Sequence, residues 1–387
     1  MAYSVVLLSF VLTPGIAMAA NEPRFDWEEQ PWKTWHTQQQ SQHQLVGRVW
    51  SARDQSFITF DELARRLLLT PFVLIGTDLH HADHHRLAAW MIKPKIQRRP
   101  VRDRALYEWI VLGWLRSGAQ RAMREFNEAH MEAVGERAKT MISDPIANSP
   151  TRGQFEKLFV RAMRYETFHG LDKLASGLKP YLIEDIRWDV YKPTIQAAYL
   201  ATLNRLMPGQ DSEKYAEDFA ANWNRIGQRP FRFRRWKHKK LDQPLSRQLR
   251  DGLMVEIERD HCVRGSLSDR NRLYRVRRYH DATAAYNMID SWFPPEKRIG
   301  KAAIIKDEDY SVFYVGENDR VRLDYGIPWY LEKMVGRSKL VVVSMKQVRK
   351  GINAPHQYIN IGPQNSAVAD YMVFTPQVST NGSQGKC

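Results

Sequence analysis

An apolar run that ends in glycine and is followed at once by a group of histidines constrains this chain more than any other feature. The run lies in residues 71–90, PFVLIGTDLHHADHHRLAAW, with Gly76 at its end and histidines at positions 80, 81, 84 and 85. A buried strand that leads into a turn crowded with imidazoles is how a ligand or metal pocket is assembled at the carboxyl edge of an α/β sheet. We therefore expect an α/β fold with a site beside this turn.

The two ends of the chain carry strand patterns and the middle carries helical patterns. Alternating or continuous apolar runs predict strands at residues 45–50, 56–60, 72–75, 105–112, 311–315 and 339–345. Apolar spacings of three and four predict helices at residues 114–142, within 155–206, at 247–261 and at 269–290. A short helix capped by Asp61 should run to Leu69. We predict a largely parallel or mixed sheet, built from both ends of the chain, with a large helical insertion.

The composition along the chain predicts five parts. They are a signal peptide at residues 1–19, an N-terminal arm at 20–44, an α/β core at 45–113 and 297–378, a helical insertion at 114–296 and a disordered tail at 379–387. Residues 1–19 hold no charged side chain and end in Ala17-Met18-Ala19, which is typical of a removed secretory signal. We expect an exported protein in the periplasm or at another extracytoplasmic, membrane-associated place, without a lipoprotein cysteine at the cleavage site.

The positive charge of the chain is concentrated. The formal net charge is +15, and residues 229–240, RPFRFRRWKHKK, interleave basic and aromatic side chains. Such a segment could bind a nucleic acid backbone, but an exported protein would rarely meet one, so we expect a solvated face or attraction to an anionic membrane surface. The two cysteines, Cys262 and Cys387, allow at most one bridge, so disulfides do not organise the fold.

Several short strings occur in the order found in one protein family. They are LVGRVW at 45–50, VLIG followed by DHHRL, a strand with Glu108, RWDVYKPTIQAA at 187–198, His261-Cys262, DYGIPWYLEK at 324–333 and ADYMVFTP at 369–376. The chain thus resembles, over residues 45–376, the ChaN-like proteins, which are exported bacterial haem-binding proteins of the Tiki, TraB and erythromycin-esterase superfamily. The resemblance implies an α/β core with a helical subdomain, a role in iron or haem acquisition, and a homodimer that holds haem at a shared surface through an axial tyrosine.

The chain departs from the family at the positions that would support chemistry. Thr77 and Leu79 occupy slots that hold Glu and His in the family, and Arg320 replaces a later histidine. If metal or hydrolytic chemistry needs that Glu and His as ligand and base, those groups are lost here. These departures therefore favour a binding protein over an enzyme.

A haem site needs an axial ligand, an apolar floor and cations for the propionates. Tyrosines in the family-like strings are the ligand candidates, and a His or Arg should stand beside the ligand to depress its phenol pKa. The haem-site candidates are Tyr191, Tyr107, Tyr325, Tyr330, Trp188 and Arg322. Among them Tyr191 has the best setting, since Trp188 and Pro193 beside it would form a flat apolar wall.

The histidines and Glu108 also support a divalent-metal alternative. His80 with His84, and His81 with His85, are each spaced by four, so a helix would align either pair for a metal with an oxygen ligand from Asp78, Asp83 or Glu108. Alternatively, Asp83 caps a helix whose first turn holds His84 and His85, while His80 and His81 are exposed. Glu108 in an apolar strand needs a partner, for which His84, His85 or Arg322 are candidates.

These patterns together predict an exported haem- or porphyrin-binding protein of the ChaN type, associated with iron or haem uptake. Two alternatives stay open. One is a metal-dependent hydrolase of the wider superfamily that uses the histidines, Asp83 and Glu108. The other is a basic interaction protein whose pocket is vestigial and which binds anionic membranes or polymers.

Overall fold

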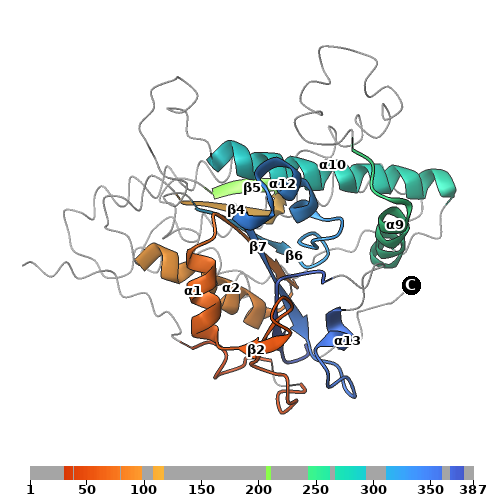
Figure 1. The fold of residues 1–387 in the computed structure, drawn as a ribbon. Coiled ribbons are helices and arrows are strands. Elements are labelled where there is room, and N and C mark those ends of the chain that lie inside the picture. Colours follow the sequence, from red (N-terminus) through yellow and green to blue (C-terminus); the bar gives the residue numbers. More distant parts are fainter. Residues whose placement is uncertain are drawn as a thin grey trace, which may run out of the picture.

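The chain folds around one mixed sheet with helices on both faces (Figure 1). A computed structural model describes residues 30–37, 39–78, 80–97, 108–116, 206–210, 243–261, 266–292, 311–359 and 367–378. The strands are β1 Val49–Ser51, β2 Ser56–Ile58, β3 Phe72–Thr77, β4 Glu108–Arg116, β5 Leu206–Gln210, β6 Ser311–Glu317, β7 Leu340–Gln347 and β8 Tyr371–Thr375. The helices are α1 Phe60–Leu68, α2 Ala82–Gln97, α9 Arg247–His261, α10 Leu267–Trp292, α12 Ile327–Val335, the short 3-10 helix η4 Arg337–Lys339 and α13 His356–Ile359.

Six neighbouring strands of the sheet run parallel and a hairpin closes one edge. The strand order is β2-β1-β8-β7-β3-β6-β4-β5, in which only the β1–β2 and β1–β8 pairs are antiparallel. The predicted α/β class, with strands from both ends of the chain, is therefore confirmed. Strand β5 begins at Leu206, where the stretch with helical periodicity ends, and it lies inside the predicted helical insertion; it forms the other edge of the sheet.

Strands β3, β6 and β7 are buried on both faces because their runs of apolar residues alternate between two cores. Val73 and Ile75 pack with α1 and α2, while Phe72 and Leu74 pack with α10 and α12. Figure 1 shows α1 and α2 on one side of the sheet and α10 and α12 on the other. With apolar layers on both faces, most polar side chains of the central strands lie near the ends of the strands, and the buried Tyr314 in the middle of β6 is an exception.

Several predicted boundaries shift for local reasons. The predicted strand at 45–50 begins only at Val49, because Gly47 has a φ of +74°, which breaks an extended run. The strand predicted at 105–112 is β4, which runs to Arg116 and so includes the first residues of the helix predicted from 114. The strands expected at 72–75, 311–315 and 339–345 and the helices expected at 247–261 and 269–290 are confirmed.

Other expectations fall on residues outside the described ranges. The signal peptide, the tail, the basic segment 229–240, both cysteines and the remainder of the predicted helices at 114–142 and 155–206 belong to this group. The boundaries of the arm, the core and the insertion stay predictions. Among the described helices, none has the length and apolar character that a membrane span requires.

Helix α1 is capped by Thr59 and not by Asp61. Thr59 Oγ1 accepts the backbone N–H of Glu62 at 3.1 Å, and its backbone is extended as an N-cap requires. The expectation for Asp61 was wrong because the helix begins at the buried Phe60, two residues earlier than a cap at Asp61 would require. Asp61 lies in the first turn, where its charge favours the helix dipole.

Removal of the Thr59 hydroxyl should destabilise the protein more than removal of the Asp61 charge. We expect Thr59→Ala to lower the free energy of unfolding by about 1 kcal/mol, because it leaves a helix N–H without its acceptor. Asp61→Asn should lower it by only about 0.3 kcal/mol, the value of one exposed charge at a helix end. Urea denaturation of the two variants measures the difference, and equal losses would contradict the assignment of the cap.

Candidate functional site

Two histidines in and after the turn that follows β3 contact the end of β8. His81 and His84 stack face to face, with ring centroids 4.0 Å apart. His84 Nδ1 accepts the backbone N–H of Asp78 at 2.8 Å, so its proton lies on Nε2, which is 2.8 Å from Thr375 Oγ1. His81 Nε2 lies 2.9 Å from the carbonyl oxygen of Pro376. The stacked imidazoles therefore connect the turn to a strand that is remote in sequence.

Both stacked imidazoles are held neutral. Burial lowers the pKa of His81, and burial together with the neighbouring His81, His85 and Lys346 lowers that of His84 well below its usual value. The histidines pair as His81 with His84, three residues apart, and not in either of the expected pairs spaced by four. His81 is buried, which corrects the alternative in which His80 and His81 were both exposed; only His80 is exposed.

Asp83 binds the N-terminal strap, which we define as residues 30–37, and does not cap α2. Its carboxylate accepts the backbone N–H groups of His36 and Thr37 at 3.0 Å each, and it forms a buried ion pair with Arg86. Arg86 also donates to the carbonyl oxygen of Thr34. Because helix α2 begins at Ala82, Asp83 already lies in its first turn and its side chain is free to reach the strap.

Glu108 does not meet the histidine turn. It is the first residue of β4 and pairs in register with Ser311 at the amino end of β6, whereas the turn follows the carboxyl end of β3 beside Gly316 and Glu317. Six residues of strand separate the two levels, about 20 Å at 3.3 Å per residue. The expected joint pocket of Glu108 with the histidines was wrong, because the strand begins at Glu108 instead of enclosing it.

The described residues hold no group of three His, Cys, Asp or Glu side chains that could bind a metal ion. The carboxylate of Asp83 is already engaged with the strap and Arg86, and the imidazoles of His81 and His84 are engaged with β8. His85 is also buried. The geometry around the turn is thus that of a structural network.

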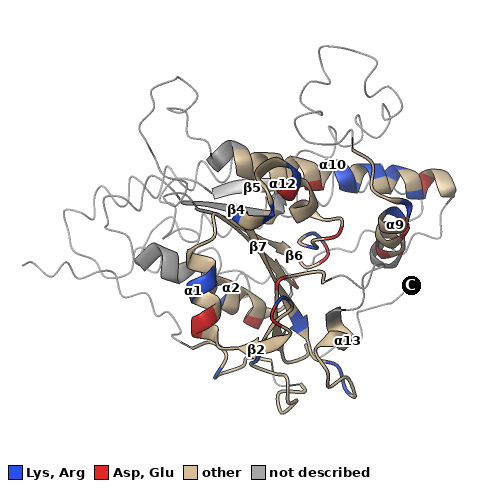
Figure 2. Cartoon of the chain, viewed as in Figure 1, with Lys and Arg blue, Asp and Glu red and all other residues tan. Residues whose placement is uncertain are grey.

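A charged cluster that the sequence did not predict lies at the carboxyl edge of the sheet, on the α10 face. Arg277 Nε is 3.0 Å from Asp281 Oδ2, and Arg277 Nη1 is 2.6 Å from Asp319 Oδ2. Arg320 Nε is 3.2 Å from Glu317 Oε2. Figure 2 shows that basic and acidic residues both occur along α10 and in the loop after β6. We call Arg277, Asp281, Tyr314, Glu317, Asp319 and Arg320 the edge cluster.

Burial shifts the protonation equilibria of the edge cluster and its surroundings. Burial raises the pKa of Asp281, although Arg277 and Arg320 oppose the shift. Burial would also raise the pKa of Asp319, but the two guanidinium groups lower it below its usual value. Lys346, at the end of β7, has its pKa lowered to about 8 by burial and by the charge of Arg322. Perturbed titratable groups at the carboxyl ends of parallel strands are typical of functional sites.

Two of the tyrosine candidates are buried hydrogen-bonding residues. Tyr325 donates its hydroxyl to Glu256 at 2.7 Å, and burial and Glu256 raise its pKa. Arg322 lies 4.4 Å above the Tyr325 ring and pairs with Asp324. Tyr330 accepts from Arg278 Nε at 2.6 Å, and burial raises its pKa as well. A raised phenol pKa is the opposite of what tyrosinate ligation needs.

Of the remaining candidate site residues, some lie outside the ranges that the structure describes and the others have structural partners. Tyr107, Tyr191, Trp188 and Leu79 lie outside the described residues. Thr77 donates its hydroxyl to the carbonyl oxygen of Gly316 and is buried. Arg320, in the slot of the family histidine, belongs to the edge cluster. A signal for this cluster was present in the sequence, since Arg277 and Asp281 are four residues apart and a run of charged residues follows the apolar strand at 311–317.

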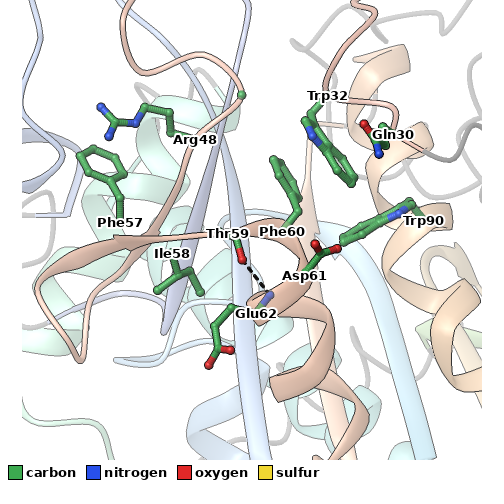
Figure 3. Close-up of a pocket in the computed structure, with 11 residues that line it drawn as sticks. Gln30, Trp32, Arg48, Phe57, Ile58, Thr59, Phe60, Asp61, Glu62 and Trp90 are labelled. Atoms are coloured by element: carbon green, nitrogen blue, oxygen red, sulfur yellow. Dashed lines mark hydrogen bonds between the residues drawn. The ribbon is translucent and has the colours of Figure 1, made fainter.

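An aromatic cavity lies on the opposite face of the sheet, between the strap, β2, α1 and α2 (Figure 3). Its volume is about 760 Å³. Trp32 of the strap stacks on Phe60 at 3.9 Å between ring centroids and 7° between planes, and Trp90 of α2 meets both rings edge-on. Across the cavity, the Arg48 guanidinium lies 3.7 Å above the Phe57 ring. Asp83 and Arg86, which bind the strap, thereby fix one wall of the cavity.

Sequence comparison finds no family model and no curated protein that matches this chain. Structural comparison finds the solved structure of ChaN of Campylobacter jejuni with cofacial heme binding, at a TM-score of 0.49 and 12% sequence identity. The match covers 84% of this chain and 95% of that chain.

Acidification should destabilise the protein through the stacked histidines. Their folded pKa values lie below the usual 6.5, so below that pH the unfolded chain takes up protons that the folded chain does not. We expect the contribution of these two histidines to the free energy of unfolding to be constant above this value and to fall by up to about 1.4 kcal/mol per pH unit for each histidine below it. Urea denaturation at a series of pH values measures the slope.

The variant His84→Asn tests the source of this slope. Asparagine keeps an acceptor for the Asp78 N–H but does not titrate, so the variant should be less stable at neutral pH and show a shallower slope below it. His80→Asn is the matched control, since His80 is exposed, and its slope should equal that of the wild type. An unchanged slope in His84→Asn would contradict the role of this residue.

Proposed function

We propose that this protein binds a haem or related porphyrin in the aromatic cavity. The observation that carries the proposal is the cavity itself, about 760 Å³ in volume and walled by Trp32, Phe57, Phe60 and Trp90. Ligand pockets of roughly 300 to 1,000 Å³ bury most of the surface of a small molecule. Flat aromatic walls suit a flat macrocycle, which they contact through ring faces and edges.

Among the polar residues of the cavity, Arg48 suits an amphipathic ligand with an anionic edge, whereas Asp61 and Glu62 are acidic. Arg48 is exposed at the cavity and can bind a carboxylate of the ligand. Glu62 also lines the cavity, but Arg66 Nε binds its carboxylate at 2.8 Å and neutralises it. A porphyrin with propionate groups has this combination of an apolar face and an anionic edge.

An axial ligand would come from outside the described lining. None of the described residues that line the cavity is a histidine, tyrosine, cysteine or methionine. Tyr191 and Tyr107, which the family resemblance favours, remain the candidates for an iron ligand. The cavity residues alone would bind the macrocycle with or without iron. An experiment can therefore separate the contribution of the aromatic lining from that of an iron ligand.

We also propose a role in haem or iron uptake by an exported protein. The apolar, uncharged segment 1–19 with its Ala-Met-Ala site supports export. The proposal favours binding over turnover, because the stacked histidines and Asp83 are engaged in structural contacts.

Titration with hemin tests the proposal. We expect a shift of the Soret band that saturates, and metal-free protoporphyrin should quench the tryptophan fluorescence with an affinity within about tenfold of that of hemin, since aromatic contacts supply most of the binding. If Tyr191 is the ligand, Tyr191→Phe should change the hemin spectrum and leave protoporphyrin binding intact. Absence of both signals in the wild type would refute the function.

Arg48→Gln tests the cavity specifically. Loss of a cation that pairs with a propionate should weaken hemin binding by about fivefold, the value of an exposed charge pair near 1 kcal/mol. Arg53→Gln is the matched control, because Arg53 is an exposed arginine in the same part of the chain that does not line the cavity. Equal affinities of the two variants would place the ligand elsewhere.

A further inference from the structure

Four buried polar atoms without a hydrogen-bond partner gather in the edge cluster. They are Arg277 Nη2, Asp281 Oδ1, Tyr314 Oη and Arg320 Nη1. Tyr314 is 0% exposed, Asp281 1%, Arg320 8% and Arg277 9%. Because buried polar groups in native proteins almost always have a partner, a concentration of such atoms indicates a place where one is supplied from outside the chain.

The remaining contacts of the cluster orient these atoms. Arg277 is fixed through Nε to Asp281 and through Nη1 to Asp319, so that Nη2 is the group left over. Arg320 is fixed through Nε to Glu317, which leaves Nη1. Arg320 Nη1 and Asp281 Oδ1 are 3.6 Å apart, too far for a hydrogen bond but close enough for a third oxygen atom to reach both.

The chemistry of the four atoms selects the ligand. Each guanidinium nitrogen can only donate, and the Tyr314 hydroxyl can donate as well, whereas Asp281 Oδ1 accepts unless it carries a proton. Donors therefore outnumber acceptors, and the complement is a group rich in acceptor oxygens. We propose that the edge cluster binds a small carboxylate anion, which enters together with a proton shared with Asp281.

The charge of the surroundings explains why a proton must accompany the anion. The groups that face Asp281 are Arg277 on its own helix, Tyr314, Asp319 and Arg320 from β6 and the loop after it, and Tyr330 from α12. Glu317 faces Arg277 and Tyr314 and adds a third carboxylate to the cluster. With all three carboxylates ionised, they outnumber the two guanidinium groups and would repel an anion. The pKa of Asp281 is raised by burial, so this carboxyl group takes up the proton most readily, and in that form it donates to the ligand.

This site is independent of the aromatic cavity. Tyr314 belongs to the core that packs on α10, whereas Phe60 and Trp90 of the cavity belong to the core on the other face of the sheet. Failure of hemin to bind therefore leaves the carboxylate site untouched, and the reverse also holds.

Calorimetric titration of the full chain with sodium acetate, at constant ionic strength set by chloride, tests the proposal. We expect saturable binding whose affinity rises by about tenfold for each unit that the pH falls, because one proton is taken up per anion. Tyr314→Phe keeps the ring and removes one donor, so it should weaken acetate binding by about tenfold. Tyr358→Phe is the matched control, since Tyr358 is a buried tyrosine of another core, and its affinity should equal that of the wild type.

Asp281→Asn separates anion binding from a merely structural network. The amide oxygen can still accept from Arg277 Nε, and the amide nitrogen donates permanently, so acetate should bind this variant with an affinity that does not change with pH. A crystal structure with acetate should place a carboxylate oxygen within hydrogen-bond distance of Arg277 Nη2 and Arg320 Nη1. No binding of acetate or formate, binding of inorganic phosphate alone, or only water at these four atoms would overturn the proposal.

Discussion

Burial of β3, β6 and β7 on both faces is the constraint on which the rest of the structure depends. Because the side chains of these strands alternate between two apolar cores, a polar group along their length costs free energy unless it has a partner. Chemistry is therefore displaced to the strand ends and to the outer surface of the helices. The histidine turn and the edge cluster both lie where parallel strands end, and the aromatic cavity lies where the strap covers α1 and α2.

The two faces of the sheet thus differ in the side chains that they offer to a ligand. On one face, the Trp32–Phe60 stack, Trp90 and Arg48 line the cavity in which we propose that a flat, amphipathic ligand binds, and the contacts of Asp83 with the strap hold its wall in place. On the other face, arginines and carboxyl groups crowd into a buried setting with donors left over. The stacked histidines connect the turn after β3 to the end of β8 and have a structural role.

The structure explains the residues at which this chain departs from the ChaN-like pattern that it resembles. Thr77 completes a hydrogen bond to Gly316 in the neighbouring strand, and the next residue along, Asp78, binds Gln347 and the backbone of His80. Arg320 joins an ion-pair network with Glu317 and Asp281 in place of an imidazole. The carboxyl edge of this chain therefore holds guanidinium groups and carboxylates, a setting suited to oxygen-rich ligands more than to transition metals.

The sequence by itself determined the buried strands β3, β6 and β7, the helices α9 and α10 and the polar turn after β3, because long apolar runs and helical spacing are local signals. Tertiary structure alone decided that β4 starts at Glu108, and hence that this carboxylate lies at the opposite edge from the histidines. It also decided that β5 joins the sheet and that Arg277 meets Asp319, 42 residues away. Strand register and helix docking depend on partners far along the chain, and no local pattern encodes them.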